Sequence, residues 1–191
     1  MRKIVILCCF FCSLTLSAVT MRDVLKSMPD SIMPLLTENN MLDMIDFMDS
    51  NMTAEVTNVL QGKSRMLILS EQFAKSALTQ SSEVELRLLD TQEPVDSISQ
   101  IICLVKTYGT DVKESRVAFY SAKWRQLNTA DYLVMPHHEP YEDTMWLANW
   151  NDEEPAMTVM SVRRLNLPAN EEQEKLEDVS IILNWDGRIL K

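Results

Sequence analysis

The spacing of hydrophobic residues predicts helices in the N-terminal part of the chain. Residues 21–28 carry apolar side chains at helical spacing, and Pro29 ends this pattern. In residues 38–52, methionine and isoleucine recur on one side of a helix, and aspartates recur on the other side. We expect Asn39 or Asn40 to cap this second helix.

Farther along the chain, the pattern takes the two-residue period of β-strands. Apolar and polar residues alternate strictly in residues 84–88, which is typical of a strand with one side in solvent. Residues 98–108 are rich in β-branched and aromatic side chains, and a turn around Gly109 joins them to an alternating run at 116–124. This arrangement predicts a hairpin. Residues 65–69 form a short apolar run, and the pattern of Met157, Val159 and Ser161, followed by Leu165 and Leu167, predicts another strand.

The C-terminal third is less regular. Residues 135–155 contain three prolines and many acidic residues without clear periodicity, so we expect a long surface loop. Residues 170–179 predict a short acidic helix with an asparagine cap, and Asp186-Gly187 between apolar flanks predicts a type I′ turn. The fold class is therefore α+β, with N-terminal helices packed on a mainly antiparallel sheet and one further short helix near the C-terminus.

The first residues have the pattern of a secretory signal peptide. Arg2 and Lys3 precede an uncharged apolar stretch that ends in the small residues Ser17 and Ala18. The stretch is shorter than the roughly 20 apolar residues that a membrane helix needs. We therefore expect a leader over 1–18 and a single exported domain over 19–191, in the periplasm or outside the cell, without stable membrane insertion.

The cysteines bear on anchoring and on reactivity. Lipid attachment requires a small residue before the cysteine, and neither Cys9 nor Cys12 has one, so we expect no lipid anchor. Loss of the leader leaves Cys103 alone, which excludes a disulfide within the domain. Cys103 lies in an apolar run, and this setting predicts a buried structural thiol instead of a nucleophile.

Charge and motifs exclude several function classes. The formal net charge of −10 opposes binding to nucleic acid and to anionic lipid surfaces. The chain has no glycine-rich phosphate loop, no G-x-S-x-G turn and no H-E-x-x-H zinc helix. We therefore expect no cofactor, and we lean toward a protein without catalytic activity.

A small group of residues nevertheless offers candidate ligands for a metal ion. His137, His138 and Glu139 are consecutive, and imidazole with carboxylate is a ligand set for divalent metals. The favoured alternative is a solvated loop, because the side chains of adjacent residues diverge. A row of aspartates could likewise bind calcium or a partner, but a solvated helix face is the better interpretation: Asp43, Asp46 and Asp49.

Aromatic residues near this loop are candidates for contact with a protein partner or a glycan. Trp146 and Trp150 are four residues apart, with Tyr141 close in sequence. Exposed tryptophans stack on sugar rings or anchor partners, but we favour the alternative in which they cover the core. Trp124 and Trp185 lie in strand-like runs and are expected in the core.

The chain resembles a known family of exported proteins. The N-terminal run carries a P-D-S…T-E-N-N…D-x-x-D-x-x-D-S-N pattern, and SSEVELRLL, IICLVKTYG and NWDGR follow later. These segments resemble domain-of-unknown-function family 3256, found among the Bacteroidales. The resemblance implies a Gram-negative source and a periplasmic or outer-surface address. It implies no activity and no catalytic residues.

Three functional hypotheses follow. The first is a non-catalytic periplasmic or secreted protein that binds or assembles with an unknown protein or glycan partner. The second is a metal-dependent hydrolase built on the 137–139 loop. The third is a carrier for a small ligand, with a pocket between the N-terminal helices and the sheet.

Overall fold

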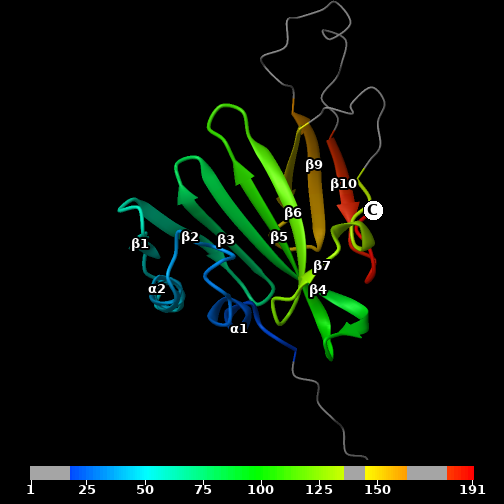
Figure 1. Cartoon of the computed structure of the whole chain (residues 1–191), viewed down its shortest axis with the longest axis horizontal. Coiled ribbons are helices and arrows are strands. Elements are labelled where there is room, and N and C mark those ends of the chain that lie inside the picture. Colours follow the sequence, from blue (N-terminus) through cyan, green and yellow to red (C-terminus); the bar gives the residue numbers. More distant parts are fainter. Residues whose placement is uncertain (1–17, 136–144, 163–179) are drawn as a thin grey trace, which may run out of the picture.

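A computed structural model describes residues 18–135, 145–162 and 180–191, and it shows three layers around a seven-stranded sheet (Figure 1). The sheet is an antiparallel meander in chain order: β1 (Glu55–Thr57), β2 (Lys63–Leu69), β3 (Phe73–Thr79), β4 (Ser82–Val95), β5 (Ile98–Tyr108), β6 (Glu114–Ser121) and β7 (Gln126–Leu127). Helices α1 (Met21–Lys26) and α2 (Glu38–Asp49) pack on one face. A short 3-10 helix, η1 (Thr129–Asp131), follows β7.

A second, three-stranded sheet covers the other face. Its strands are β8 (Met145–Trp150), β9 (Ala156–Val162) and β10 (Ser180–Asn184), paired antiparallel in the order β10-β9-β8. The α+β class and the mainly antiparallel sheet are therefore confirmed. None of the helices in the described part of the chain has the length and hydropathy that a membrane crossing needs.

Both helices begin with a capping box at a threonine. The Thr37 side chain accepts a hydrogen bond from the backbone N–H of Asn40, and the Asn40 side chain accepts one from the backbone N–H of Thr37. The prediction that Asn39 or Asn40 is the cap was therefore wrong. Asn40 is instead the third helical residue and completes the box. Thr20 and Asp23 form the same arrangement at α1.

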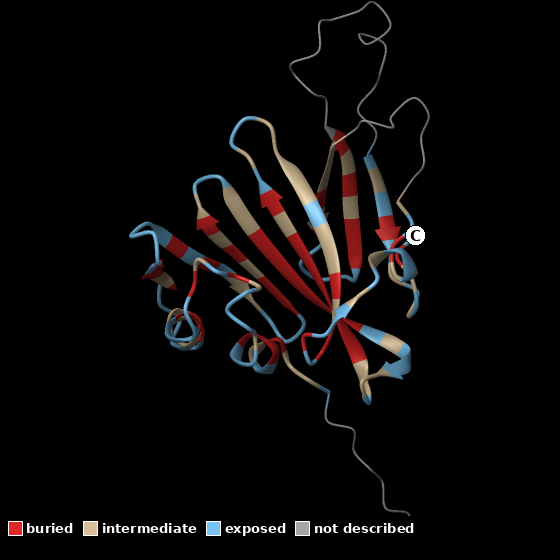
Figure 2. Ribbon diagram, in the orientation of Figure 1, coloured by how far each residue is buried: buried red, intermediate tan, exposed pale blue. Residues whose placement is uncertain are grey.

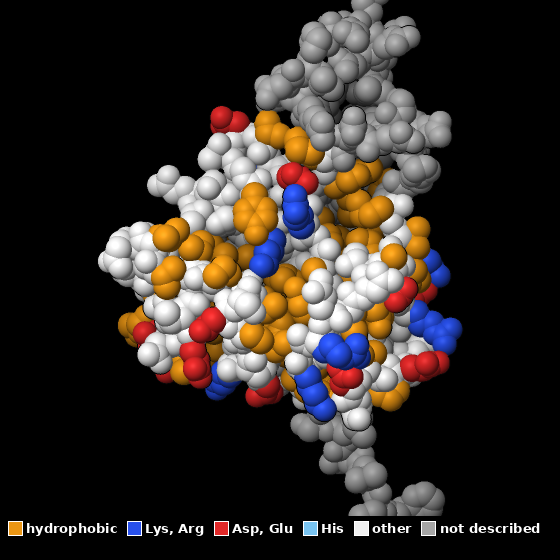
Figure 3. Space-filling view, in the orientation of Figure 1, with side chains coloured by type: hydrophobic (Ala, Val, Ile, Leu, Met, Phe, Trp, Pro, Cys, Tyr) orange, Lys and Arg blue, Asp and Glu red, His pale blue; other side chains and the backbone are white. Residues whose placement is uncertain are grey.

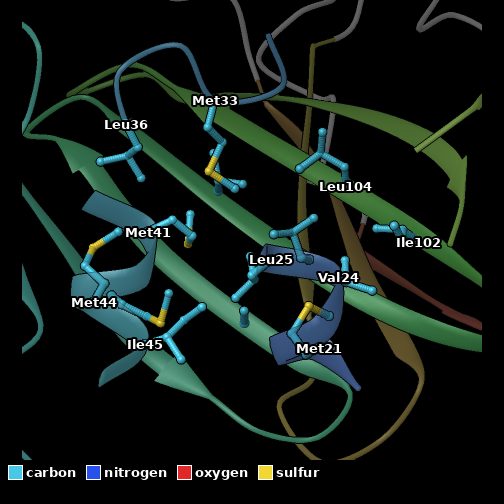
Figure 4. Packing of buried hydrophobic residues seen from close by; sticks show 14 of the residues in the cluster. Met21, Val24, Leu25, Met33, Leu36, Met41, Met44, Ile45, Ile102 and Leu104 are labelled. Carbon is cyan, nitrogen blue, oxygen red and sulfur yellow. The ribbon is translucent and has the colours of Figure 1, made fainter. Parts of the chain in front are cut away.

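The central sheet carries a separate hydrophobic core on each face. On the helix side, Met41, Met44 and Ile45 of α2 and Val24 and Leu25 of α1 face the strands (Figure 4). On the other side, side chains of β4 to β6 pack against β8, β9 and β10. Because one sheet serves both cores, the middles of its central strands are buried throughout (Figure 2).

The strand at 84–88 exists, but its polar side does not face solvent. Glu85 is 4% exposed and Arg87 is 2% exposed. The alternating pattern predicted a half-buried strand, and that prediction was wrong because the second sheet covers these charges. Hairpin partners β5 and β6, in contrast, pair as predicted around Gly109.

Other differences from prediction lie toward the C-terminus. The predicted loop over 135–155 contains β8, so that prediction was wrong for residues 145–150. At the last turn Gly187 has a φ of 91°. Asp186, the first central residue of the predicted Asp-Gly turn, has no positive φ, so the turn is not type I′ as predicted. The helix predicted at 170–179 lies outside the described residues.

Candidate functional site

Most of the predicted site residues lie outside the described part of the chain: His137, His138, Glu139 and Tyr141. The metal site and the hydrolase built on it therefore stay predictions. Within the described ranges, no group of three or more His, Cys, Asp or Glu side chains is arranged to hold a metal ion. The three aspartates of α2 are solvent-exposed, and Asp49 pairs with Arg22 of α1 at 2.7 Å.

The two tryptophans predicted as contact residues both lie on β8. Trp150 is 5% exposed and belongs to the core between the two sheets, as the favoured interpretation predicted. Its backbone N–H donates to the Glu85 carboxylate at 2.7 Å. Trp146 is half-buried and packs against the same core, so a contact role for it stays a prediction.

Cys103 lies at the centre of the molecule, on β5. It is 0% exposed, and burial raises the pKa of its thiol well above the ordinary value. A nucleophilic cysteine needs a lowered thiol pKa and partial exposure. Cys103 is therefore a structural residue, as the sequence predicted.

Two buried charges on β4 connect the sheets. Lys75 of β3 forms an ion pair with Glu85, and its Nζ atom lies 2.8 Å from Oε1 of the carboxylate. Desolvation lowers the pKa of Lys75, but the hydrogen bond to Glu85 and the charge of Glu85 raise it, so that the pKa is raised overall. Arg87 donates from Nη1 to the carbonyls of Asn151 and Asp152 at 2.9 and 3.0 Å, and from Nη2 to the Glu153 carbonyl at 3.1 Å. These bonds fasten the β8–β9 turn to the large sheet, so the cluster holds the layers together.

A small hollow is lined by residues of α1, the start of α2 and the segment between them. The hollow beside α1 and the start of α2 has a volume of about 10 Å³, which is room for about one water molecule. Small-ligand sites are typically several hundred Å³. None of the residues that line this hollow belongs to the sheet, and the hollow gives the carrier hypothesis no support.

The helix-side face of the large sheet is less well covered at β5 and β6. The following residues form what we name the β5–β6 strip: Lys106, Tyr108, Glu114, Arg116, Ala118 and Tyr120. All of these side chains point to the helix side of the sheet. The members on β5 follow Ile102 and Leu104 at every second position, and the members on β6 lie directly opposite β5 residues of the same face. Tyr108 is 49% exposed and Arg116 is exposed; the other members are half-buried.

Figure 3 shows the molecule from this side, with α1 and the segment after it in front of the large sheet. Hydrophobic side chains gather across the middle of the face, two Lys or Arg side chains lie above them, and an Asp or Glu side chain lies directly above the upper of these two. The strip therefore combines apolar surface with two cations, Lys106 and Arg116, and one carboxylate, Glu114.

The charges of the strip have no carboxylate partner in the part of the chain that the structure describes. Lys106 and Arg116 are direct cross-strand partners. The Lys106 ammonium group donates to the Ile32 carbonyl at 2.6 Å, and burial lowers its pKa. Arg116 makes no ion pair among the described residues. Glu114, two residues before it on β6, makes none either.

Sequence reasoning did not find this strip. Lys106 and Arg116 are ten residues apart along the chain, and Tyr108 and Glu114 are six apart. These residues meet only through the register of the hairpin. The available signal was the hairpin itself: aligning 98–108 with 114–121 across Gly109 would have placed the two cations together.

Comparisons with known proteins give a family and a fold. A family model described as a protein of unknown function (DUF3256) matches residues 13–177. No curated protein matches the chain. Among solved structures, a domain of an uncharacterized protein from Porphyromonas gingivalis W83 is similar, with a TM-score of 0.73 and 20% identity over 92% of this chain and 98% of that chain. At this identity the likeness concerns the fold alone.

Proposed function

The chain belongs to the family of proteins of unknown function DUF3256, and we propose that it is a non-catalytic binding protein whose ligand docks on the β5–β6 strip. One observation carries this proposal: Lys106 and Arg116 lie directly opposite each other on an open part of the sheet. Like charges opposite each other destabilise a sheet, and no acidic side chain of the described residues pairs with either. A bound anionic group would offset this repulsion.

Two further observations support binding over catalysis. Cys103 is enclosed between the two sheets, where no substrate reaches its thiol. The charged side chains that are buried, Glu85 and Arg87, are bonded to Lys75 and to backbone groups of β8 and its turn. A catalytic residue needs access to the reacting atoms, and these groups have none.

The second part of the proposal concerns location. We propose that the protein is exported to the periplasm or the cell exterior, on the strength of the basic start, apolar stretch and small residues over 1–18. N-terminal sequencing of protein from fractionated cells tests this directly. We expect a new N-terminus after Ser17 or Ala18 in an extracytoplasmic fraction. An intact N-terminus in the cytoplasmic fraction would contradict it.

Site-specific crosslinking in the source bacterium tests the binding role. A photoreactive residue at position 108 is expected to give a discrete adduct, because Tyr108 is exposed beside the unpaired cations. The adduct is expected to disappear when Arg116→Glu is added. A photoreactive residue at the exposed position Lys123, outside the strip, is the matched control. Equal adducts at both positions, or none at position 108, would refute docking on the strip.

A further inference from the structure

We infer that the ligand of the β5–β6 strip is a short acidic saccharide, with a carboxylate group held by Lys106 and Arg116 and a sugar ring laid on Tyr108. This inference rests on the proposed function and specifies its ligand class. Three properties of the strip carry it: the spacing of the cations, the exposed aromatic ring beside them, and the open shape of the surface.

The spacing of the cations suits a single acidic group. Directly opposite residues in an antiparallel pair have Cβ atoms about 5 Å apart, so both side chains of the Lys106–Arg116 pair can contact one carboxylate. The Lys106 ammonium group is already fixed by the Ile32 carbonyl at 2.6 Å, which limits the freedom that binding would have to remove. The fork of donors on Arg116 matches the two oxygens of a carboxylate.

The aromatic ring indicates a sugar next to that group. Tyr108 lies two residues from Lys106 on the same face of β5, about 7 Å along the strand. Its side chain is 49% exposed and has no ring partner among the described aromatic contacts. A flat, amphipathic ring at such a place offers its face to the C–H groups of a sugar and its hydroxyl to a sugar oxygen.

The shape of the surface and the charge of the chain narrow the ligand further. A lipid tail requires an enclosed apolar pocket, whereas Tyr108 and Arg116 of the strip are exposed to solvent. A long polyanion would be repelled outside the strip, because the net charge of the chain is −10. A saccharide of a few rings with carboxylates avoids both difficulties.

Calorimetric titration of the protein isolated after expression of the full-length chain tests the inference. The probes are trigalacturonate, neutral maltotriose and triglutamate, an acidic peptide. We expect trigalacturonate to bind, with an affinity that falls as salt is added, and maltotriose to give no detectable heat. Triglutamate is expected to bind at least about fivefold more weakly than trigalacturonate, because it has no sugar ring to contact Tyr108.

Variants separate the contributions of charge and ring. Arg116→Glu is expected to weaken trigalacturonate binding about tenfold, and Arg116→Gln about threefold, since an exposed charge pair contributes modestly and reversal replaces attraction by repulsion. Lys123→Glu changes the net charge equally and is expected to leave binding unchanged. Tyr108→Ala is expected to weaken trigalacturonate binding about fivefold without affecting triglutamate. Unchanged thermal unfolding of each variant verifies its folding.

Several outcomes overturn the inference. One is absence of trigalacturonate binding. Another is equal binding of triglutamate together with no effect of Tyr108→Ala, which would identify a site for anionic peptides. If crosslinking at position 108 gives an adduct but trigalacturonate does not bind, the saccharide inference is wrong and the proposed binding function stands. If both fail, neither stands.

Discussion

Arg87 is a buried residue that joins the large sheet to the β8–β9 turn. Its guanidinium group is 2% exposed, lies over the Phe73 ring with its carbon 5.6 Å from the ring centroid, and donates to three successive carbonyls of the β8–β9 turn. A guanidinium stays protonated even where burial lowers its pKa. Buried charges of this kind are costly to uncouple, because the groups left behind lose their partners.

We predict that Arg87→Met lowers the free energy of unfolding by about 3 kcal/mol. Methionine retains most of the apolar volume, so the loss reports the three hydrogen bonds and the buried carbonyls left without donors. Urea denaturation measures it. Arg65→Met is the control, because Arg65 is exposed and makes one surface ion pair with Glu55, and there we expect less than about 1 kcal/mol. Equal effects of the two substitutions would contradict the anchoring role.

Among the elements, the β5–β6 hairpin matters most for the site, because its register brings Lys106 and Arg116 together. The hairpin turns at Gly109, which has a φ of 119°. A Cβ atom added there would lie 1.9 Å from the carbonyl oxygen of Val112. Glycine is required at this position by both the backbone conformation and the close approach.

We predict that Gly109→Ala lowers the free energy of unfolding by more than about 2 kcal/mol, because alanine meets both a disfavoured φ and a backbone clash. Gly62→Ala is the matched control. Its Cβ would lie 3.4 Å or more from the Asn58 side chain, in ordinary contact, so we expect a change below about 1 kcal/mol. Thermal or urea unfolding of both variants compares them. A mild effect at position 109 would show that the turn rearranges readily.

At the scale of the whole molecule, one sheet separates two cores, and Cys103 lies deep in the core between the sheets. Access to this thiol requires the sheet of β8, β9 and β10 to separate from the large sheet. The two layers are joined by the Arg87 bonds and by Ser115 of β6, which accepts a hydrogen bond from the Ala148 N–H at 3.0 Å.

We predict that the Cys103 thiol of the native protein reacts with a soluble thiol reagent at least about a thousandfold more slowly than in urea, because labelling requires an opening that approaches global unfolding. Peptide mass spectrometry distinguishes Cys103 from the cysteines of residues 1–18. Ser180→Cys places a thiol at an exposed position and should label rapidly. Fast native labelling of Cys103 would mean that the two sheets separate easily.

The sequence by itself determined the elements that depend on local periodicity and turn chemistry. These were the helical stretches at 21–28 and 38–52, the hairpin around Gly109 and the apolar setting of Cys103, because spacing, glycine and β-branched content act within a few residues. They also sufficed for the α+β class and the family.

Only the tertiary structure decided what covers each face of the sheet. Glu85 and Arg87 have the pattern of a solvent-facing side, yet β8, more than 55 residues later in the chain, buries them. The same reason applies to the candidate site. Lys106 and Arg116 become neighbours through strand register, and Arg116 remains exposed while the Lys106 ammonium group reaches the segment after α1. Contacts between distant segments set both outcomes, and local patterns carry no information about such contacts.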